Sequence, residues 1–337
     1  MKTPFVSIVV PMYNSENTIE SCLDSLLNLN YPKNKYEIIV VDDHSTDKSA
    51  KIVSDFKKIN GNVILLKQPI GKKGPAAARN LGISRAKGEF IASTDADEMM
   101  FPDWLNELIP YFSNQEVAAV GALLVEEHPL DSGLAPKIQS IIIDPHFKPG
   151  TVAAGNVVYR KKVLQEAGCF NEFCRFNDLD VDLHYRMQEK GFELMPIQKY
   201  LGQHKQRHTL RAFYKRMFGF GAAGMIISFL NFKSAFSTNF KNQKGVFSYF
   251  ALFSLLVAYS IALIGGVFLD INLTFWFLLS ALGAIAFTSL IWAGIRIKKT
   301  NSKAMYFPAV SLYIFAKLIA LLHGIFYGFF YYLRRKK

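Results

Sequence analysis

The sequence predicts an α/β protein in which a doubly wound, mostly parallel sheet is followed by helices that cross a membrane. Three observations lead to this prediction. Short apolar runs alternate with stretches of helical periodicity between residues 5 and 94, acidic residues follow two of those runs, and residues 246–295 carry a single charged side chain, Asp270. Strands that alternate with helices form sheets covered on both faces, whereas long uncharged runs enter bilayers.

The elements of the sheet follow in chain order from apolar runs and helical spacing. The loop at 71–75 is rich in Gly and Lys and ends in Pro. The expected strands are 5–10, 37–41, 63–66 and 90–94, and the expected helices are 19–27, a segment ending near 59, and 76–86.

A second part, residues 117–205, combines strand-like and helical patterns. Its expected strands are 117–125 and 156–160, and its expected helices are 161–167 and 178–190. Within the last helix, Asp180 shares a face with His184, and Asp182 shares one with Arg186. We expect Arg186 to pair with Asp182.

The C-terminal part contains hydrophobic segments of membrane-spanning length. Residues 246–268 and 273–295 are two such segments, and residues 308–330 form a third that contains Lys317 and His323. Each can cross a hydrocarbon core of roughly 30 Å. We therefore expect residues 246–337 to form a membrane domain with about three hydrophobic segments. The alternative is a buried helical hairpin in a soluble protein.

Basic residues flank these segments and account for much of the formal charge of +12. The positive-inside rule then places the N-terminal domain in the cytoplasm of a multi-pass protein of the cell membrane. The basic tail at 334–337 conflicts with three full crossings. Either the third segment is re-entrant or part of 218–232 also enters the bilayer.

Residues 211–245 are expected to lie in the membrane interface, because aromatic side chains alternate there with Arg211, Lys215 and Arg216. A basic flank beside bilayer segments suits lipid phosphate, not nucleic acid. The three cysteines form neither a disulfide framework nor a metal spacing, which suits a reducing compartment. The first apolar run is too short for a signal peptide.

Two groups of carboxylates follow expected strands. Asp42 and Asp43 end the second strand, and Asp95 and Asp97 follow the fourth. Because the carboxyl ends of parallel strands meet at one edge of a sheet, these groups converge where such sheets bind ligands. Oxygen ligands on rigid strand ends suit a divalent cation bound to a diphosphate, and two close acids need such neutralisation.

These residues resemble glycosyltransferase family 2, with the GT-A fold, over about residues 5–210. The resemblance implies an inverting transfer from a nucleotide-diphosphate sugar, assisted by Mg²⁺ or Mn²⁺. Membrane-anchored members act on lipid phosphates, lipid-linked glycans or polysaccharides, so polyprenyl phosphate or a lipid-linked glycan is the expected acceptor. The matching stretches are 6–14 (VSIVVPMYN), 38–47 (IIVVDDHSTD), 77–82 (AARNLG), 94–97 (TDAD) and 180–183 (DVDL).

The resemblance implies roles for the residues that bind the nucleotide. Pro11, Tyr13 and Asn14 would line the nucleotide pocket. Asp43 would accept a hydrogen bond from a ring N–H of the base, and Asp42 would support its loop.

It also implies roles at the diphosphate. Arg79 would face the diphosphate from its helix, and a surface ion pair is the alternative for it. Asp95 would hold the ribose or a metal-bound water, and Asp97 would bind the metal. Lys72 and Lys73 are read as a solvated basic loop.

The expected catalytic base is Asp180, which matches the Asp of a Glu-Asp motif in the family. The chain departs from the motif because Leu179 stands where the family has Glu. Asp178 or Asp182 is therefore an alternative base. With an ionised lipid phosphate as acceptor, a base is less necessary.

Residues 203–208 resemble a Gln-x-x-Arg-Trp segment of the family that clamps the acceptor or the diphosphate. His204, Arg207 and His208 are the candidate acceptor or phosphate ligands, and a solvated surface is the alternative. His208 replaces the Trp, which argues against the alternative function of a processive polysaccharide synthase.

Two other functions are alternatives to glycosyl transfer. A catalytically silent, glycosyltransferase-like membrane scaffold would be expected to lack Asp97 or Asp180, and both are present. A nucleotidyltransferase usually has a Gly-rich loop after its first strand, and residues 11–14 do not form one.

Overall fold

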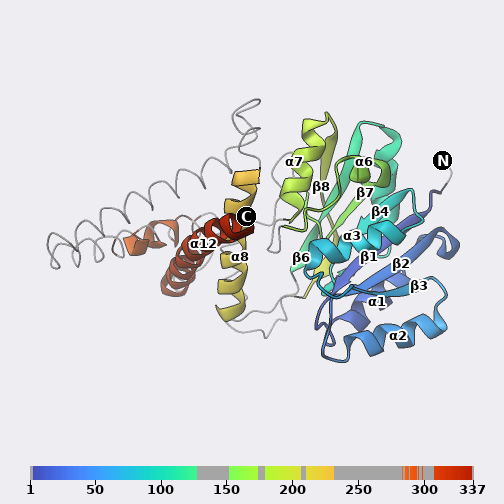
Figure 1. Ribbon diagram of the computed structural model, residues 1–337, viewed down its shortest axis with the longest axis horizontal. Helices are drawn as coiled ribbons and strands as arrows, with labels where there is room; N and C mark the ends of the chain where they lie inside the picture. Colours follow the sequence, from blue (N-terminus) through green and yellow to red (C-terminus); the bar gives the residue numbers. More distant parts are fainter. Residues whose placement is uncertain are drawn as a thin grey trace. The chain divides into compact units, whose positions relative to one another are not determined.

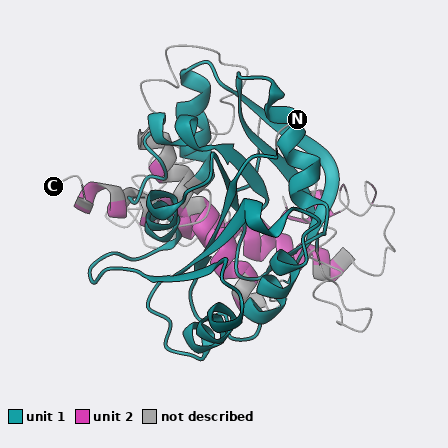
Figure 2. Cartoon of the chain, turned by 90° about the vertical axis from the view of Figure 1, so that its right-hand side faces the viewer, with its two compact units in different colours: residues 1–127, 145–175, 179–206 teal, residues 128–144, 176–178, 207–337 magenta. Residues whose placement is uncertain are grey.

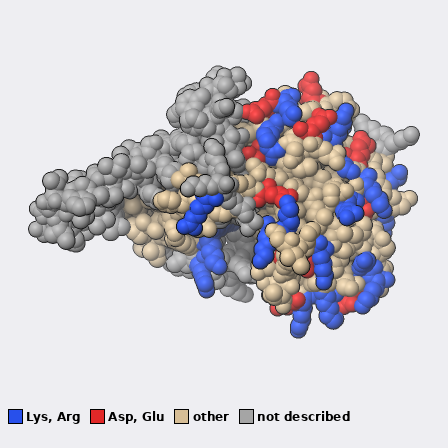
Figure 3. All heavy atoms as spheres, viewed as in Figure 1, with Lys and Arg blue, Asp and Glu red and all other residues tan. Residues whose placement is uncertain are grey.

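The computed structural model of the protein describes residues 3–126, 152–173, 179–205, 210–230 and 307–335, with some positions between 283 and 298 (Figure 1). The chain divides into two compact units (Figure 2). The first unit comprises residues 1–127, 145–175 and 179–206 and carries the sheet, and the second comprises residues 128–144, 176–178 and 207–337. On the visible face of the first unit, basic and acidic side chains are interspersed (Figure 3).

The sheet has eight strands in the order β3-β2-β1-β4-β7-β6-β8-β5. Its first half is parallel: β1 (Val6–Met12) lies between β2 (Tyr36–Asp42) and β4 (Phe90–Ser93), and β3 (Val63–Lys67) flanks β2. β1, β2 and β4 are nearly continuous apolar runs because both of their faces are buried. The four expected strands are confirmed.

The second half of the sheet is mixed, so the expectation of a mostly parallel sheet is correct only for the first half. β7 (Val157–Arg160) is antiparallel to both β4 and β6 (Val117–Glu126), whereas β8 (Glu193–His204) is parallel to β6. β5 (Glu98–Met100) pairs with β8 in antiparallel fashion.

Helices cover both faces of the parallel half. The even-numbered residues of β1 share one core cluster with α1 (Ile19–Leu27) and with Val53 of α2 (Ser49–Ile59). Val9 points to the opposite face, where it lies against Gly82 of α3 (Pro75–Arg85). The alternation of side chains along a strand therefore sorts these helices into two layers. The remaining helices of this unit are α4 (Trp104–Leu108), α6 (Lys161–Glu166) and α7 (Leu179–Glu189), with 3-10 turns at Lys33–Lys35 and Ile109–Ser113.

In the second unit, α8 (Leu210–Leu230) packs against α12 (Phe307–Arg335). The two backbones approach closely at Gly324, where an added Cβ would lie 2.0 Å from the carbonyl oxygen of Phe218. Only glycine fits at such a crossing. Tyr214 Oη and His323 Nδ1 lie 3.0 Å apart and form a hydrogen bond beside it.

The predicted hydrophobic segments fare differently. Residues 246–268 and most of 273–295 lie outside the described part of the chain, as does 231–245 of the expected interfacial segment. The third predicted segment, 308–330, lies within α12. Across the residues that the structure describes, no helix combines the length and the apolarity that a bilayer crossing needs, so the third segment is not supported as a span.

We predict that Gly82→Ala lowers the melting temperature. The added methyl group would lie 2.5 Å from Cγ1 of the buried Val9, and overpacking of this kind costs about 1–3 kcal/mol. Gly61→Ala is the matched control, because nothing lies within 4 Å of a Cβ placed there. Equal melting temperatures for the two variants would contradict this packing of α3 on the sheet.

Candidate active site

The carboxyl ends of three neighbouring strands bring the predicted site residues to one edge of the sheet. Met12 pairs with Asp42 across β1 and β2, and Val9 pairs with Ser93 across β1 and β4. Tyr13 therefore follows the central strand, Asp43 follows one neighbour, and Asp95 follows the other. Pro11 lies within β1, and Tyr13 is 60% exposed at this edge.

Asn14 and Asp42 build the loops of this edge. The side-chain oxygen of Asn14 accepts a hydrogen bond of 2.8 Å from the backbone N–H of Thr46, which ties the β1 loop to the β2 loop. Asn14 adopts a φ of 47°, a left-handed conformation that Asn tolerates better than most residues. The buried carboxylate of Asp42 accepts from the backbone N–H of Ser45 at 3.0 Å. Both side chains are thus engaged in loop structure.

Asp43 keeps one carboxylate oxygen without a protein partner. Its Oδ2 accepts a hydrogen bond of 2.8 Å from the backbone N–H of Gly74, whereas its buried Oδ1 has no partner among the described residues. Such an atom costs about 1–3 kcal/mol unless a ligand satisfies it. Asp43 is therefore placed to accept a hydrogen bond from a bound molecule.

Gln68 is a second residue of this kind, and the sequence reasoning missed it. It follows β3, and its backbone N–H donates to the Asp42 carbonyl at 2.9 Å, which places it beside the Asp43 loop. The side chain is 5% exposed, and its Nε2 has no partner among the described residues. The edge therefore offers one buried acceptor and one buried donor.

Arg79 is committed to protein contacts. Its guanidinium is buried under α3, donates to Ser93 Oγ at 3.1 Å and forms an ion pair with Asp95 at 2.5 Å. It also lies 5.7 Å from the ring centre of Phe170. Arg79 was expected to face the diphosphate, but this geometry favours an indirect role in which it orients Asp95.

Asp97 and His204 meet across β5 and β8. Asp97 Oδ2 lies 3.5 Å from His204 Nε2, and the Asp97 carbonyl accepts from the backbone N–H of Lys205 at 2.9 Å. The side chains of Asp95 and Asp97 remain 41% and 45% exposed. The structure thus brings His204 to the acid pair, whereas Arg207 and His208 lie outside the described residues.

The donor set suits a cation that arrives with a diphosphate. Within the described ranges, no three His, Cys, Asp or Glu side chains form a cluster that could hold a metal alone. Mg²⁺ sites in enzymes commonly use one or two carboxylates together with substrate phosphates and water. The exposed pair Asp95 and Asp97 fits that arrangement.

Glu98 is a buried acid that the sequence reasoning also missed. Its Oε2 accepts hydrogen bonds of 2.9 Å from both Thr94 Oγ1 and the backbone N–H of Asp95. Burial, followed by the charge of Asp95, raises the pKa of Glu98 to about 8, although His204 opposes the shift. A third acid after a strand does not reveal its burial from spacing alone.

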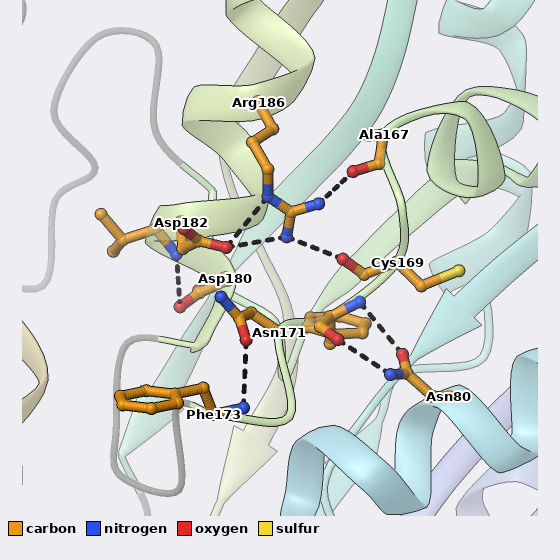
Figure 4. A network of polar contacts seen from close by, with 10 residues as sticks. Asn80, Ala167, Cys169, Asn171, Phe173, Asp180, Asp182 and Arg186 are labelled. Atoms are coloured by element: carbon orange, nitrogen blue, oxygen red, sulfur yellow. Dashed lines mark hydrogen bonds and ion pairs between the residues drawn. The ribbon is translucent and has the colours of Figure 1, made fainter. Parts of the chain in front are cut away.

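The two aspartates in the first turn of α7, Asp180 and Asp182, make different contacts (Figure 4). Asp182 is buried and accepts from Arg186 Nε at 3.0 Å and from Nη2 at 2.8 Å, which confirms the expected pair. Arg186 also donates to the carbonyls of Ala167 and Cys169 and so fixes the loop after α6. Asp182 is therefore a poor candidate for the base, and Asp178 lies outside the described residues.

Asp180 is only partly buried. Its Oδ2 accepts a hydrogen bond of 2.8 Å from the backbone N–H of Ala154, and its Oδ1 accepts from Val181 at 3.2 Å. Behind it, His184 forms a 2.9 Å hydrogen bond with Tyr159, and burial lowers the pKa of that histidine. A neutral His184 therefore belongs to the core, and Asp180 is the more accessible of the two aspartates in the first turn of α7.

We predict that Glu98→Gln flattens the pH dependence of stability in metal-free buffer. The folded-state pKa of about 8 lies above the ordinary value of 4.5, so the folded protein holds a proton that the unfolded chain releases. The contribution of Glu98 to the free energy of unfolding should then be greatest below about pH 4.5 and decline as the pH rises toward 8.

Glutamine keeps the acceptor and removes the titration. The variant should therefore gain melting temperature relative to the native chain at pH 8 more than at pH 5. Glu20→Gln, on the exposed face of α1, is the control. Parallel pH curves for the native protein and the Glu98 variant would contradict the assignment.

Comparison with known proteins gives one family. The sequence profile described as "Glycosyl transferase family 2" matches residues 7–166. Among curated proteins, the chain is 50% identical over 93 residues to poly(ribitol-phosphate) beta-glucosyltransferase of Bacillus spizizenii, which covers 28% of this chain and 15% of that protein. It is 28% identical over 208 residues to glycosyltransferase AglE of Haloferax volcanii, covering 60% and 68% of the two chains.

A longer alignment extends the likeness to curated glycosyltransferases, and a solved structure shares the fold. The probable glycosyltransferase YdaM of Bacillus subtilis is 23% identical over 352 residues, which cover 97% of this chain and 82% of that protein. The mannosyltransferase PcManGT of Pyrobaculum calidifontis, solved with GDP-Man and Mn²⁺, superposes with a TM-score of 0.60 at 19% identity, covering 95% and 87% of the chains. The structural likeness supports the GT-A-like fold.

Proposed function

We propose that this chain, whose residues 7–166 form a family 2 glycosyltransferase domain, transfers a sugar from a nucleotide-diphosphate sugar to a membrane-associated acceptor. The observation that carries the proposal is the edge of the sheet at which Tyr13, Asp43 and Asp95 follow adjacent parallel strands. Such an edge is where open α/β sheets bind nucleotides.

The nucleoside would occupy the end of the edge near β2 and β3. The exposed ring of Tyr13 can stack on a base, and the free Oδ1 of Asp43 can accept from a ring N–H. The unpartnered Nε2 of Gln68 can donate to a neighbouring acceptor on the base. One ligand would thereby satisfy both buried polar atoms.

The diphosphate would lie toward β4. Asp97, with Asp95, would hold Mg²⁺ or Mn²⁺, which neutralises negative charge on the departing nucleotide diphosphate. Arg79 would keep Asp95 oriented through their ion pair. His204 lies against Asp97 and can contribute to the same end of the site as a phosphate or acceptor ligand.

Transfer would be a single displacement with inversion at the anomeric carbon. The acceptor hydroxyl oxygen forms the new bond to that carbon while the bond to the diphosphate oxygen breaks. Asp180 would take the hydroxyl proton, because it is the accessible aspartate in the first turn of α7 and its Oδ2 is oriented by Ala154. An ionised phosphate acceptor would not require this proton transfer.

The membrane-associated acceptor rests on sequence and on relatives. The names of curated relatives include poly(ribitol-phosphate) and monoglucosyldiacylglycerol enzymes, which are polymer and lipid chemistries. Residues 246–268 and 273–295 are apolar and flanked by basic residues. These features support a cell-membrane protein whose sheet unit faces the cytoplasm, where nucleotide sugars are made.

The direct test incubates the purified protein with a panel of nucleotide sugars and a membrane lipid extract. We expect one donor to release nucleotide diphosphate only when lipid is present, with the sugar recovered in the lipid fraction. Absence of release with every donor and extract would overturn the proposed activity.

We predict that Asp97→Ala lowers kcat with any donor by about a hundredfold or more, because the substitution removes charge stabilisation of the leaving group. Steady-state release of nucleotide diphosphate measures the effect. Asp24→Ala, an exposed acid on α1, should retain full activity. Normal turnover in the Asp97 variant would refute the role of this carboxylate.

We predict that Asp180→Asn and Asp182→Asn fail in different ways. Asp180→Asn should lose transfer and donor hydrolysis together while nucleotide affinity and melting temperature survive. Asp182→Asn should lose stability, because breaking a buried pair such as that with Arg186 costs about 3–5 kcal/mol. Thermal unfolding and calorimetric nucleotide binding separate the two. Retained transfer in Asp180→Asn would place the base elsewhere or indicate a phosphate acceptor.

A further inference from the structure

The Asp-x-Asp turn and Asp180 belong to distant parts of the sequence, yet one short segment touches both. Residues 152–156 immediately precede β7, and we refer to them as the strap. The backbone N–H of Ala154 donates to Asp180 Oδ2 at 2.8 Å. The adjacent Gly155 lies against Glu98, where an added Cβ would be 2.2 Å from Oε1.

Glu98 in turn sets the turn that carries the acid pair. Its Oε2 accepts from Thr94 Oγ1 and from the backbone N–H of Asp95, both at 2.9 Å, so one carboxylate oxygen fixes the start of the turn. Glu98 is 4% exposed and Gly155 is buried. The Glu98 side chain thus contacts the turn through Oε2 and lies against the strap through Oε1.

Both ends of the strap pack against buried neighbours. Asn156 is fully buried: its Oδ1 accepts from Trp104 Nε1 at 2.7 Å, and its Nδ2 donates to the Leu123 carbonyl at 3.0 Å. At the other end, Val152 packs on Gly121 of β6. A Cβ added to Gly121 would lie 2.6 Å from the Cβ of Val152. Contacts at both ends therefore fix the position of the strap.

We propose that Glu98 is a positioning residue, and that it and the strap hold the Asp95 and Asp97 turn in a fixed geometry relative to Asp180. This inference rests on the proposed function for the roles of the three aspartates. One chain of contacts, Asp95–Glu98–Gly155–Ala154–Asp180, would then connect the residues on the donor side of the reaction with the base on the acceptor side.

The test combines Glu98→Ala, Glu98→Gln and Gly155→Ala with the double variant Glu98→Ala/Gly155→Ala. Gly61→Ala is the control for the glycine, and Glu20→Gln is the control for the acid. Mn²⁺ binding, alone and with UDP or GDP, is measured by calorimetry and by loss of the free-ion paramagnetic signal. Melting temperature is recorded for each variant, and kcat and KM are recorded with any active donor.

We expect Glu98→Ala to weaken Mn²⁺ binding by about 10–100-fold, the usual loss when a group that orients a metal ligand is removed. Glu98→Gln should restore binding to within about threefold of the native protein, a margin well inside that loss. With an active donor, kcat should fall more than the donor KM rises. Unchanged Mn²⁺ binding in a folded Glu98→Ala variant would overturn the positioning role.

Gly155→Ala should impair both Mn²⁺ binding and kcat, since its methyl group displaces Glu98 and shifts Ala154. In the double variant the methyl group occupies the space that the truncated Glu98 vacates. The double variant should therefore be less impaired than the sum of the single variants, which is the signature of residues in contact. Additive losses would overturn the link through the strap.

The outcomes for the two proposals are separable. Mn²⁺ binding and non-additivity are measured without a donor or an acceptor, so they stand even if no sugar transfer is found. Conversely, transfer with native Mn²⁺ binding in every variant would sink the link through the strap and leave the proposed function intact.

Discussion

The parallel pairing of β1 with both β2 and β4 is the constraint on which the rest of the site depends. Parallel neighbours must end at the same edge, so the loops after these three strands are neighbours whatever their sequences contain. The register places Met12 beside Asp42 and Val9 beside Ser93. The acids that follow are thereby collected from distant points of the chain before any side chain contributes an interaction.

Burial then divides the ionisable groups into those that shape the site and those left for ligands. Arg79, Asp182 and Glu98 are nearly inaccessible, and each meets partners that offset the loss of water. Breaking such a buried interaction is expensive, so these groups are fixed components of the fold. Asp95 and Asp97 keep more than a third of their side chains exposed, which leaves carboxylate oxygens able to meet an incoming cation.

Unsatisfied polarity shows where a ligand belongs. Asp43 Oδ1 and Gln68 Nε2 are buried without partners among the described residues. A ligand that satisfied both atoms would stabilise the folded protein. Close packing explains the glycine at position 155, because a side chain there would displace Glu98, which orders the turn that carries Asp95 and Asp97.

The parallel half of the sheet, its flanking helices and the edge positions of Asp43, Asp95 and Asp97 could be predicted from the sequence, as could the helix that carries Asp180. Continuous apolar runs specify buried strands, and acids directly after them must lie at the carboxyl edge, so local patterns were sufficient. The sequence also predicted the pair of Asp182 with Arg186, because helical spacing alone brings them together.

The contacts of Arg79, Gln68, Glu98 and Gly155 became apparent only in the folded chain. A sequence position does not state whether an arginine faces solvent or lies under a helix against Asp95, nor which of three neighbouring acids is buried. The antiparallel placement of β5 and β7 likewise depends on long-range pairing. These properties arise from contacts between segments far apart in the chain, which periodicity and spacing do not encode.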